Sequence, residues 1–169
     1  MSVYAKFATL AATASLVAAA TVADARPTRG KITGQNGSIS AVKGANGSAV
    51  RARGAKRNAD GSVTAGSAGG FKTATGAGGR ASTTTVNPDG SANRRSQAAV
   101  AGARGNAATS SNVTRNADGS YSGGRTTTAT SAATGNTYNG STQIDPATGK
   151  PVRAATCTDA NGTVIACPR

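Results

Sequence analysis

The 169-residue sequence has no histidine, glutamate or tryptophan, and its only methionine is Met1. Histidine and glutamate are the side chains that most often transfer protons in enzymes near neutral pH. Metal centres that depend on histidine or on several thiolates are also excluded, because the chain has only two cysteines. We therefore predict a protein that is not an enzyme, with no catalytic, metal-binding or cofactor-binding residues.

The beginning of the chain, residues 1–25, has the pattern of a secretory signal peptide. Lys6 supplies a positive charge, residues 7–22 are apolar, and Ala23 and Ala25 occupy the minus 3 and minus 1 positions of a cleavage site. The apolar run is shorter than the roughly 20 residues that span a bilayer. We expect cleavage after Ala25, no membrane span in the mature chain, and a secreted, periplasmic or cell-surface location.

Large apolar residues are scarce in the mature chain, residues 26–169. It contains no leucine, and valine, isoleucine, phenylalanine and tyrosine make up roughly a tenth of it. A chain with so few apolar residues and a high net charge is usually disordered. Only a repeat, whose neighbouring units cover one another, offers such a chain a route to order. A largely disordered chain is therefore the alternative to a repeat protein.

Such a repeat is present. The phrase RNADGS at residues 57–62 returns at 115–120, and VNPDGS lies midway between them at 86–91, so the phrase recurs every 29 positions. Asparagine, aspartate or proline followed by glycine favours a tight turn in which the glycine has a positive φ. One carboxylate per turn is too few for calcium, which takes six to eight oxygen ligands. The expected turn residues are Asn58, Asp60, Gly61, Asn87, Asp89, Gly90, Asn116, Asp118 and Gly119.

A second set of glycines divides each unit into halves. Gly47, Gly76 and Gly105 each lie 14 positions before a glycine of the first set. The segments between the turns, such as RASTTTV, are rich in residues that favour strands. Each unit is therefore predicted to hold two strands of roughly ten residues and two tight turns. The predicted fold class is all-β.

Two arrangements of these strands fit the period. In an antiparallel β-meander successive strands pair side by side, whereas in a two-sided β-solenoid each unit is one coil and equivalent residues stack. Tight turns favour the meander, which we prefer, and an apolar column with the same period suits the solenoid. The solenoid is loosely similar to bacterial curlin fibre subunits, which are secreted strand-turn-strand repeats, although their regular Gln and Asn positions have no match here. The column consists of Val42, Phe71, Val100 and Ala129, and a weaker one of Val63, Ala92 and Tyr121 is expected on the same face.

The chain is thus divided into a signal peptide (1–25), an N-terminal segment (26–44), β-hairpin repeats (45–149) and a C-terminal hairpin (150–169). Export favours a disulfide between Cys157 and Cys167. A four-residue turn at DANG, however, places Cys157 opposite Val164, three residues short of Cys167. Either the loop is wider than this motif indicates, or the two thiols stay apart.

The charge of the mature chain is strongly positive. Removal of Lys6 and Asp24 leaves eighteen basic and five acidic residues, so the net charge stays at +13. A basic sheet attracts polyanions such as lipopolysaccharide, acidic polysaccharide or extracellular DNA, and the same charges oppose pairing of sheet edges. Aromatic residues are too few for sequence-specific nucleic-acid binding. The candidate polyanion-binding residues are Arg51, Arg53, Lys56, Arg57, Arg94 and Arg95.

Together these features predict an exported structural or adhesive protein of the cell surface or extracellular matrix, which assembles with itself into a homo-oligomer or fibre. The alternative function is a monomeric basic module that binds anionic polymers.

Overall fold

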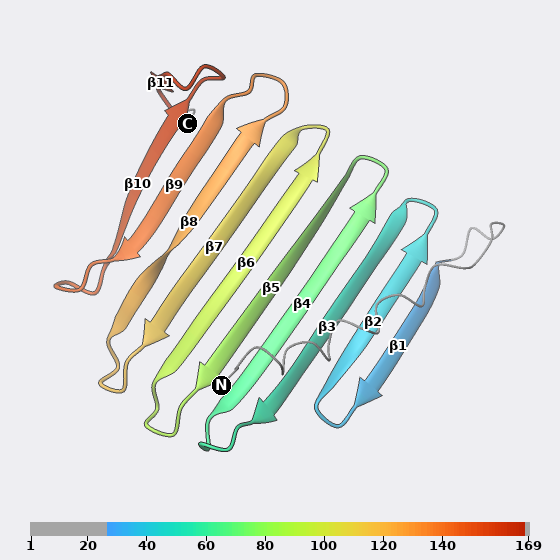
Figure 1. The fold of residues 1–169 in the computed structure, drawn as a ribbon, viewed down its shortest axis with the longest axis vertical. Coiled ribbons are helices and arrows are strands. Elements are labelled where there is room, and N and C mark those ends of the chain that lie inside the picture. The colour runs from blue at the N-terminus through green and yellow to red at the C-terminus, as the bar shows by residue number, and fades with distance from the viewer. Residues whose placement is uncertain (1–26, 168–169) are drawn as a thin grey trace, which may run out of the picture.

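A computed structural model describes residues 27–167, and the expected signal peptide with Ala23 and Ala25 lies outside them. The described residues form one antiparallel sheet of eleven strands, in which every strand pairs with the next one along the chain (Figure 1). The predicted all-β meander is confirmed, and the solenoid and disordered alternatives are wrong. The strands are β1 (Thr28–Gly34), β2 (Gly37–Gly44), β3 (Gly47–Arg57), β4 (Val63–Thr73), β5 (Gly76–Val86), β6 (Ala92–Gly102), β7 (Gly105–Arg115), β8 (Tyr121–Ser131), β9 (Thr137–Ile144), β10 (Pro151–Thr158) and β11 (Val164–Ile165).

The 29-residue period follows from the dimensions of the hairpins. Strands β4 and β5 are each 11 residues long. Residues 74–75 form the short turn between them, and residues 87–91 form the longer turn that leads to β6. Each turn returns the chain alongside the preceding strand, and every strand pairs antiparallel with the next one along the chain. In a two-sided solenoid, equivalent strands of successive units would stack on each other instead, so the observed pairing excludes the solenoid.

The apolar column that suited a solenoid has a different origin in the meander. Phe71 of β4 lies opposite Ala49 of β3 on one side and Gly78 of β5 on the other. Gly78 in turn lies opposite Val100 of β6. Residues 29 positions apart thus lie in one row with a single strand between them, and large residues alternate with small ones from Val42 to Ala107. This apolar row runs through Val42, Ala49, Phe71, Gly78, Val100, Ala107, Ala129, Tyr138, Cys157 and Ile165.

The sheet is a single layer, and both of its faces are open (Figure 1). Among residues 27–167 only Cys157 and Ser62 are buried, with 3% and 2% of their surface exposed. Even Phe71, in the apolar row, is 46% exposed. The part of the chain that the structure describes therefore has no hydrophobic core.

This part of the chain also contains no helix long and apolar enough to span a membrane.

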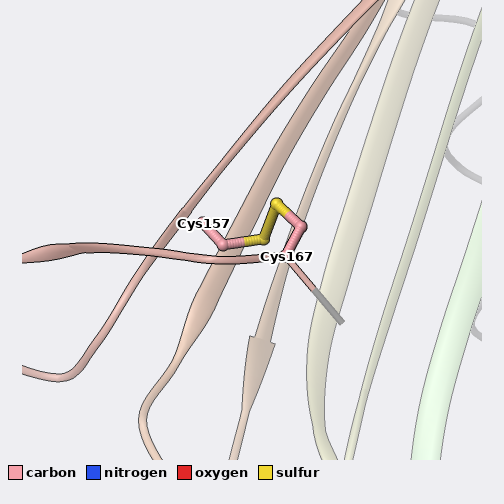
Figure 2. Close-up of a disulfide and its surroundings, with 2 residues drawn as sticks. All are labelled: Cys157 and Cys167. Atoms are coloured by element: carbon pink, nitrogen blue, oxygen red, sulfur yellow. A yellow bond between two sulfur atoms is a disulfide. The ribbon is translucent and has the colours of Figure 1, made fainter. Parts of the chain in front are cut away.

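The C-terminal hairpin ends in the expected disulfide between Cys157 and Cys167, whose Cα atoms are 5.2 Å apart (Figure 2). Of the two alternatives left by the sequence, the wider loop is confirmed: Thr158 faces Val164, and Cys157 faces Ile165. The loop is one residue wider than the DANG motif indicates. Because β11 ends at Ile165, the two residues after it leave the ladder and bring Cys167 back to Cys157.

Candidate functional surfaces

The aspartates of the repeat belong to one recurring turn, which we call the carboxylate turn and which comprises residues 58–62, 87–91 and 116–120. In the first copy, the backbone N–H of Asn58 donates to the Ser62 carbonyl at 2.8 Å, and the N–H of Gly61 donates to the Asn58 carbonyl at 3.1 Å. Gly61 has a φ of 82°, and the equivalent Gly90 and Gly119 have 83° and 87°. The positive φ predicted for these three glycines is therefore confirmed.

Side chains reinforce each carboxylate turn. Ser62 donates both its hydroxyl, at 2.7 Å, and its backbone N–H, at 2.9 Å, to Oδ1 of Asp60. The amide of Asn58 donates to the Ser62 hydroxyl at 2.8 Å. The other two copies repeat these bonds with the same partners. The recurrence of Asn, Asp, Gly and Ser in the sequence is thus explained by one hydrogen-bonded unit.

These hydrogen bonds affect the titration of the carboxylates. The Ser62 hydroxyl and then the Ser62 backbone N–H hold the pKa of Asp60 below its ordinary value, and the equivalent serines do the same for Asp89 and Asp118. The backbone N–H of Ala147, followed by the Thr148 hydroxyl, lowers the pKa of Asp145. Neutral partners therefore stabilise the ionised form of each carboxylate. Residues 27–167 hold no group of three or more side chains placed to bind a metal ion.

The two faces of the sheet differ sharply in charge. Successive side chains of a strand point to opposite faces, and residues opposite each other on neighbouring strands share a face. We call the face that bears Phe71 the arginine face, because the strands place ten basic residues and no acidic residue on it. These ten are Arg29, Lys31, Arg51, Arg53, Arg57, Arg80, Arg94, Arg115, Arg125 and Arg153.

A shallow hollow of about 650 Å³ lies on the arginine face. Phe71 and Val100 of the apolar row form part of its wall, and Arg51, Arg80 and Arg125 also line it. The ring of Phe71 leans over Gly78, since a Cβ built on Gly78 would lie 2.8 Å from the Phe71 Cε1 atom. The hollow therefore combines apolar side chains with three arginines, a combination that suits an anionic ligand with an apolar part.

The opposite face, which bears Ala99, has only four basic residues on its strands, Lys43, Lys56, Lys72 and Arg95. We call it the neutral face, because its two central rows contain no charged residue from β2 to β10. One central row consists of Ala41, Val50, Gly70, Gly79, Ala99, Ala108, Thr128, Asn139 and Thr156, and the other of Ile39, Ala52, Ala68, Ala81, Gln97, Ser110, Thr126, Ser141 and Ala154.

The candidate polyanion-binding residues are thus divided between the two faces. Arg51, Arg53, Arg57 and Arg94 lie on the arginine face, whereas Lys56 and Arg95 lie on the neutral face. Local density along the chain grouped Arg94 with Arg95 and Arg57 with Lys56, although neighbours in a strand point apart. Sequence reasoning also missed Arg80, Arg115, Arg125 and Arg153, which only the cross-strand register brings onto the arginine face.

The described part of the chain is therefore an open, single-layer β-meander repeat with one strongly basic face and one face whose central rows carry no charge. Comparison of the chain with models of protein families, with curated proteins and with solved structures gave no match.

Proposed function

We propose that this protein is an exported structural or adhesive protein of a cell surface or extracellular matrix, and that it acts by assembling with copies of itself. One observation carries the proposal: among residues 27–167, only two side chains are buried. Ordering a residue costs about 1.5 kcal/mol, and small, solvent-exposed side chains recover little of that cost. Contact with further copies would cover this exposed surface and stabilise the sheet.

The positive charge opposes assembly and also controls it. All five aspartates of the mature chain lie in turns, so the ten basic residues of the arginine face have no acidic neighbour on the strands. Repulsion between such faces is screened over a Debye length of about 8 Å at physiological ionic strength. Added salt or an anionic polymer should therefore speed assembly.

Sedimentation velocity of the mature chain tests this proposal. The protein is measured over a range of concentrations, first at low salt, then at high salt, and finally with an acidic polysaccharide. We expect larger species at high protein concentration, and more of them when salt or polysaccharide is present. A folded monomer that is indifferent to concentration, salt and polysaccharide would contradict self-assembly.

A second function, a monomeric module that binds anionic polymers, is favoured by the one-sided distribution of arginine. Arg51 and Arg80 lie in one row with Gly69 of β4 between them. Strands are about 4.8 Å apart, so the two Cα atoms are roughly 10 Å apart, and glycine leaves the space between their side chains open. Guanidinium groups form paired hydrogen bonds with carboxylate, sulfate and phosphate groups. A polyanion that crosses β3, β4 and β5 would meet both of these cations within about 10 Å.

The two functions differ in what they require of the oligomeric state. A binding module stays monomeric, and its affinity for a polyanion falls steeply as salt rises, because binding releases counterions. A structural protein assembles even without a polyanion once salt has screened its charges. Sedimentation with and without polysaccharide at high salt separates the two, since polyanion binding is weakest there and self-assembly strongest.

A further inference from the structure

We propose that two copies of the chain stack back to back through their neutral faces and leave both arginine faces exposed to solvent. The inference rests on the proposed self-assembly, and it specifies the surface through which the first contact between copies forms. The arginine face is a poor choice for this contact. Stacking it on itself would bring two sets of ten cations together with no acidic residue between them, and like charges across an interface are costly.

The edges of the sheet are also poor sites for the contact. The edge strand β1 bears Arg29 and Lys31, and basic residues at an edge oppose pairing with another strand. The outer edge of β10 begins with Pro151 and is covered at its other end by β11. Proline lacks the N–H that a ladder requires. The neutral face is the extended surface that none of these features blocks.

The side chains of the neutral face suit close stacking. Its central rows between β3 and β6 consist of alanine, glycine, Val50 and Gln97. Small side chains let two sheets approach closely, as in flat silk-like assemblies. The four basic residues of this face lie outside the central rows, nearer the ends of the strands. Their charged groups can therefore reach solvent at the rim of a stacked pair.

The neutral face also has apolar anchors at its N-terminal side. Ile32 of β1 lies directly opposite Ile39 of β2, and Ile39 lies opposite Ala52 of β3. The side chains of Ile32 and Ile39 are 74% and 41% exposed. A stacked copy would remove both from water, and the gain grows with the apolar area covered.

The available area is sufficient for a stable pair. Strands β3 to β8 are each 11 residues long. With a strand spacing of about 4.8 Å and a rise of about 3.4 Å per residue, they offer a face on the order of 1,000 Å² per copy. Stable interfaces bury about 800 Å² per partner. Two sheets of the same twist can stack with their strands about 30° apart.

Adjacent alanines in one strand provide a matched test. Ala99 of β6 is an exposed residue of the neutral face, whereas Ala98 lies on the arginine face. Sedimentation at high salt would compare the wild type with Ala99→Lys and with Ala98→Lys. A lysine buried without a partner in the stacked interface should weaken self-association by about 100-fold. The Ala98→Lys variant adds the same charge outside the interface and should associate like the wild type.

The wild-type chain also allows a test that does not depend on the folding of a variant. Hydroxyl-radical footprinting would compare the assembled with the monomeric protein. We expect Ile32 and Ile39 to be protected severalfold on assembly, and Phe71 and Val100 of the arginine face to stay reactive. Circular dichroism would verify that both lysine variants are folded.

The outcomes separate the stacking inference from the proposed function. A wild type that stays monomeric at all salt concentrations contradicts both. A wild type that assembles while Ala99→Lys and Ala98→Lys assemble equally well, or one in which Phe71 is protected and Ile39 is not, overturns the stacking and leaves self-assembly through another surface. Selective loss of assembly in Ala99→Lys, or protection confined to Ile32 and Ile39, supports the stacking.

Discussion

The arginine face and the neutral face are built by the same strands, and neighbouring residues often contribute to opposite faces. Arg94 and Arg95 are an example, because the first lies on the arginine face and the second on the neutral face. Both faces also use the same small residues, alanine, glycine, serine and threonine. The difference between them therefore depends on the register of the strands and not on the composition of any segment.

The register of the strands determines which residues share a face, because side chains alternate strictly along a strand. A slip of one residue would move every side chain of that strand to the other face. The turns prevent such slips, so that the arginines of β3, β5, β7 and β8, together with Arg94 of β6, fall on one side of the sheet. A repeated turn is thus the device that gives a thin sheet two chemically distinct surfaces.

The largest expected effect is on the affinity for a polyanion when charge is removed from the arginine face. The comparison is a variant that loses the same number of charges from the neutral face. Replacement of Arg51, Arg80 and Arg125 by glutamine should strongly weaken binding to duplex DNA, used here as a polyanion probe. Each lost contact should reduce the salt slope of the affinity by about 1. Fluorescence anisotropy at several salt concentrations would measure this slope.

The matched control for that experiment replaces Lys43, Lys56 and Lys72 of the neutral face by glutamine. It removes the same number of charges from the opposite side of the sheet. We expect a clearly smaller loss of affinity and of salt slope. Equal losses in the two triple variants would show that net charge alone matters and that the two faces do not differ in binding.

A second prediction concerns the covalent bond at the C-terminal end of the sheet. Replacement of both Cys157 and Cys167 by serine should lower the free energy of unfolding by about 2 to 3 kcal/mol, because the disulfide restricts the unfolded chain. Urea denaturation measures the difference, and the wild type in reducing buffer is the control. If the reduced and oxidised proteins unfold at the same urea concentration, the disulfide does not stabilise this end of the sheet.

A third prediction tests the carboxylate turn, which fixes the register of the strands and so decides which residues lie on each face. Gly90 has a φ of 83°, and a Cβ at this position would meet no other atom within 4 Å. Gly90→Val should therefore destabilise the protein by about 1 to 3 kcal/mol through backbone strain alone. Thermal unfolding would compare it with Gly90→Asn, because asparagine tolerates a positive φ, and with Ser82→Ala in the adjacent strand. Equal stability of all three variants would contradict a strained turn at this position.

The smallest predicted effect is an acid sensitivity that arises from the carboxylate turns and from the turn that contains Asp145. The folded state lowers the pKa of Asp60, Asp89, Asp118 and Asp145. Their contribution to stability is therefore complete above the unfolded pKa of about 3.9, and it is lost as the pH falls through the lower folded values. Urea denaturation between pH 5 and pH 2, about the range in which carboxylates titrate, should show this loss of stability.

The variant Asp60→Asn/Asp89→Asn/Asp118→Asn serves as the comparison in the acid titration. It should be less stable than the wild type at pH 5, because each serine then donates to a neutral oxygen. Its stability should depend less on pH, since the variant removes three of the four carboxylates whose pKa is lowered. An undiminished acid transition in this variant would assign the pH dependence to other groups.

The sequence by itself determined the strands, the turns and their period. RNADGS and VNPDGS place asparagine, aspartate, glycine and serine at the positions that close one five-residue turn, and turn geometry is a local property of the chain. The scarcity of large apolar residues likewise excluded a conventional core. The disulfide was also predicted from the sequence, although its local spacing argued against it.

Only the tertiary structure decided what the repeat presents to its surroundings. The column of Val42, Phe71 and Val100 fits a meander and a solenoid equally well, because both align residues that are 29 positions apart. Likewise, the density of arginine along the chain cannot separate Arg94 from Arg95, and it cannot unite Arg51 with Arg80 and Arg125. Face membership depends on which residues lie opposite each other in different strands, and that register is fixed only when the hydrogen-bonded ladders form between them.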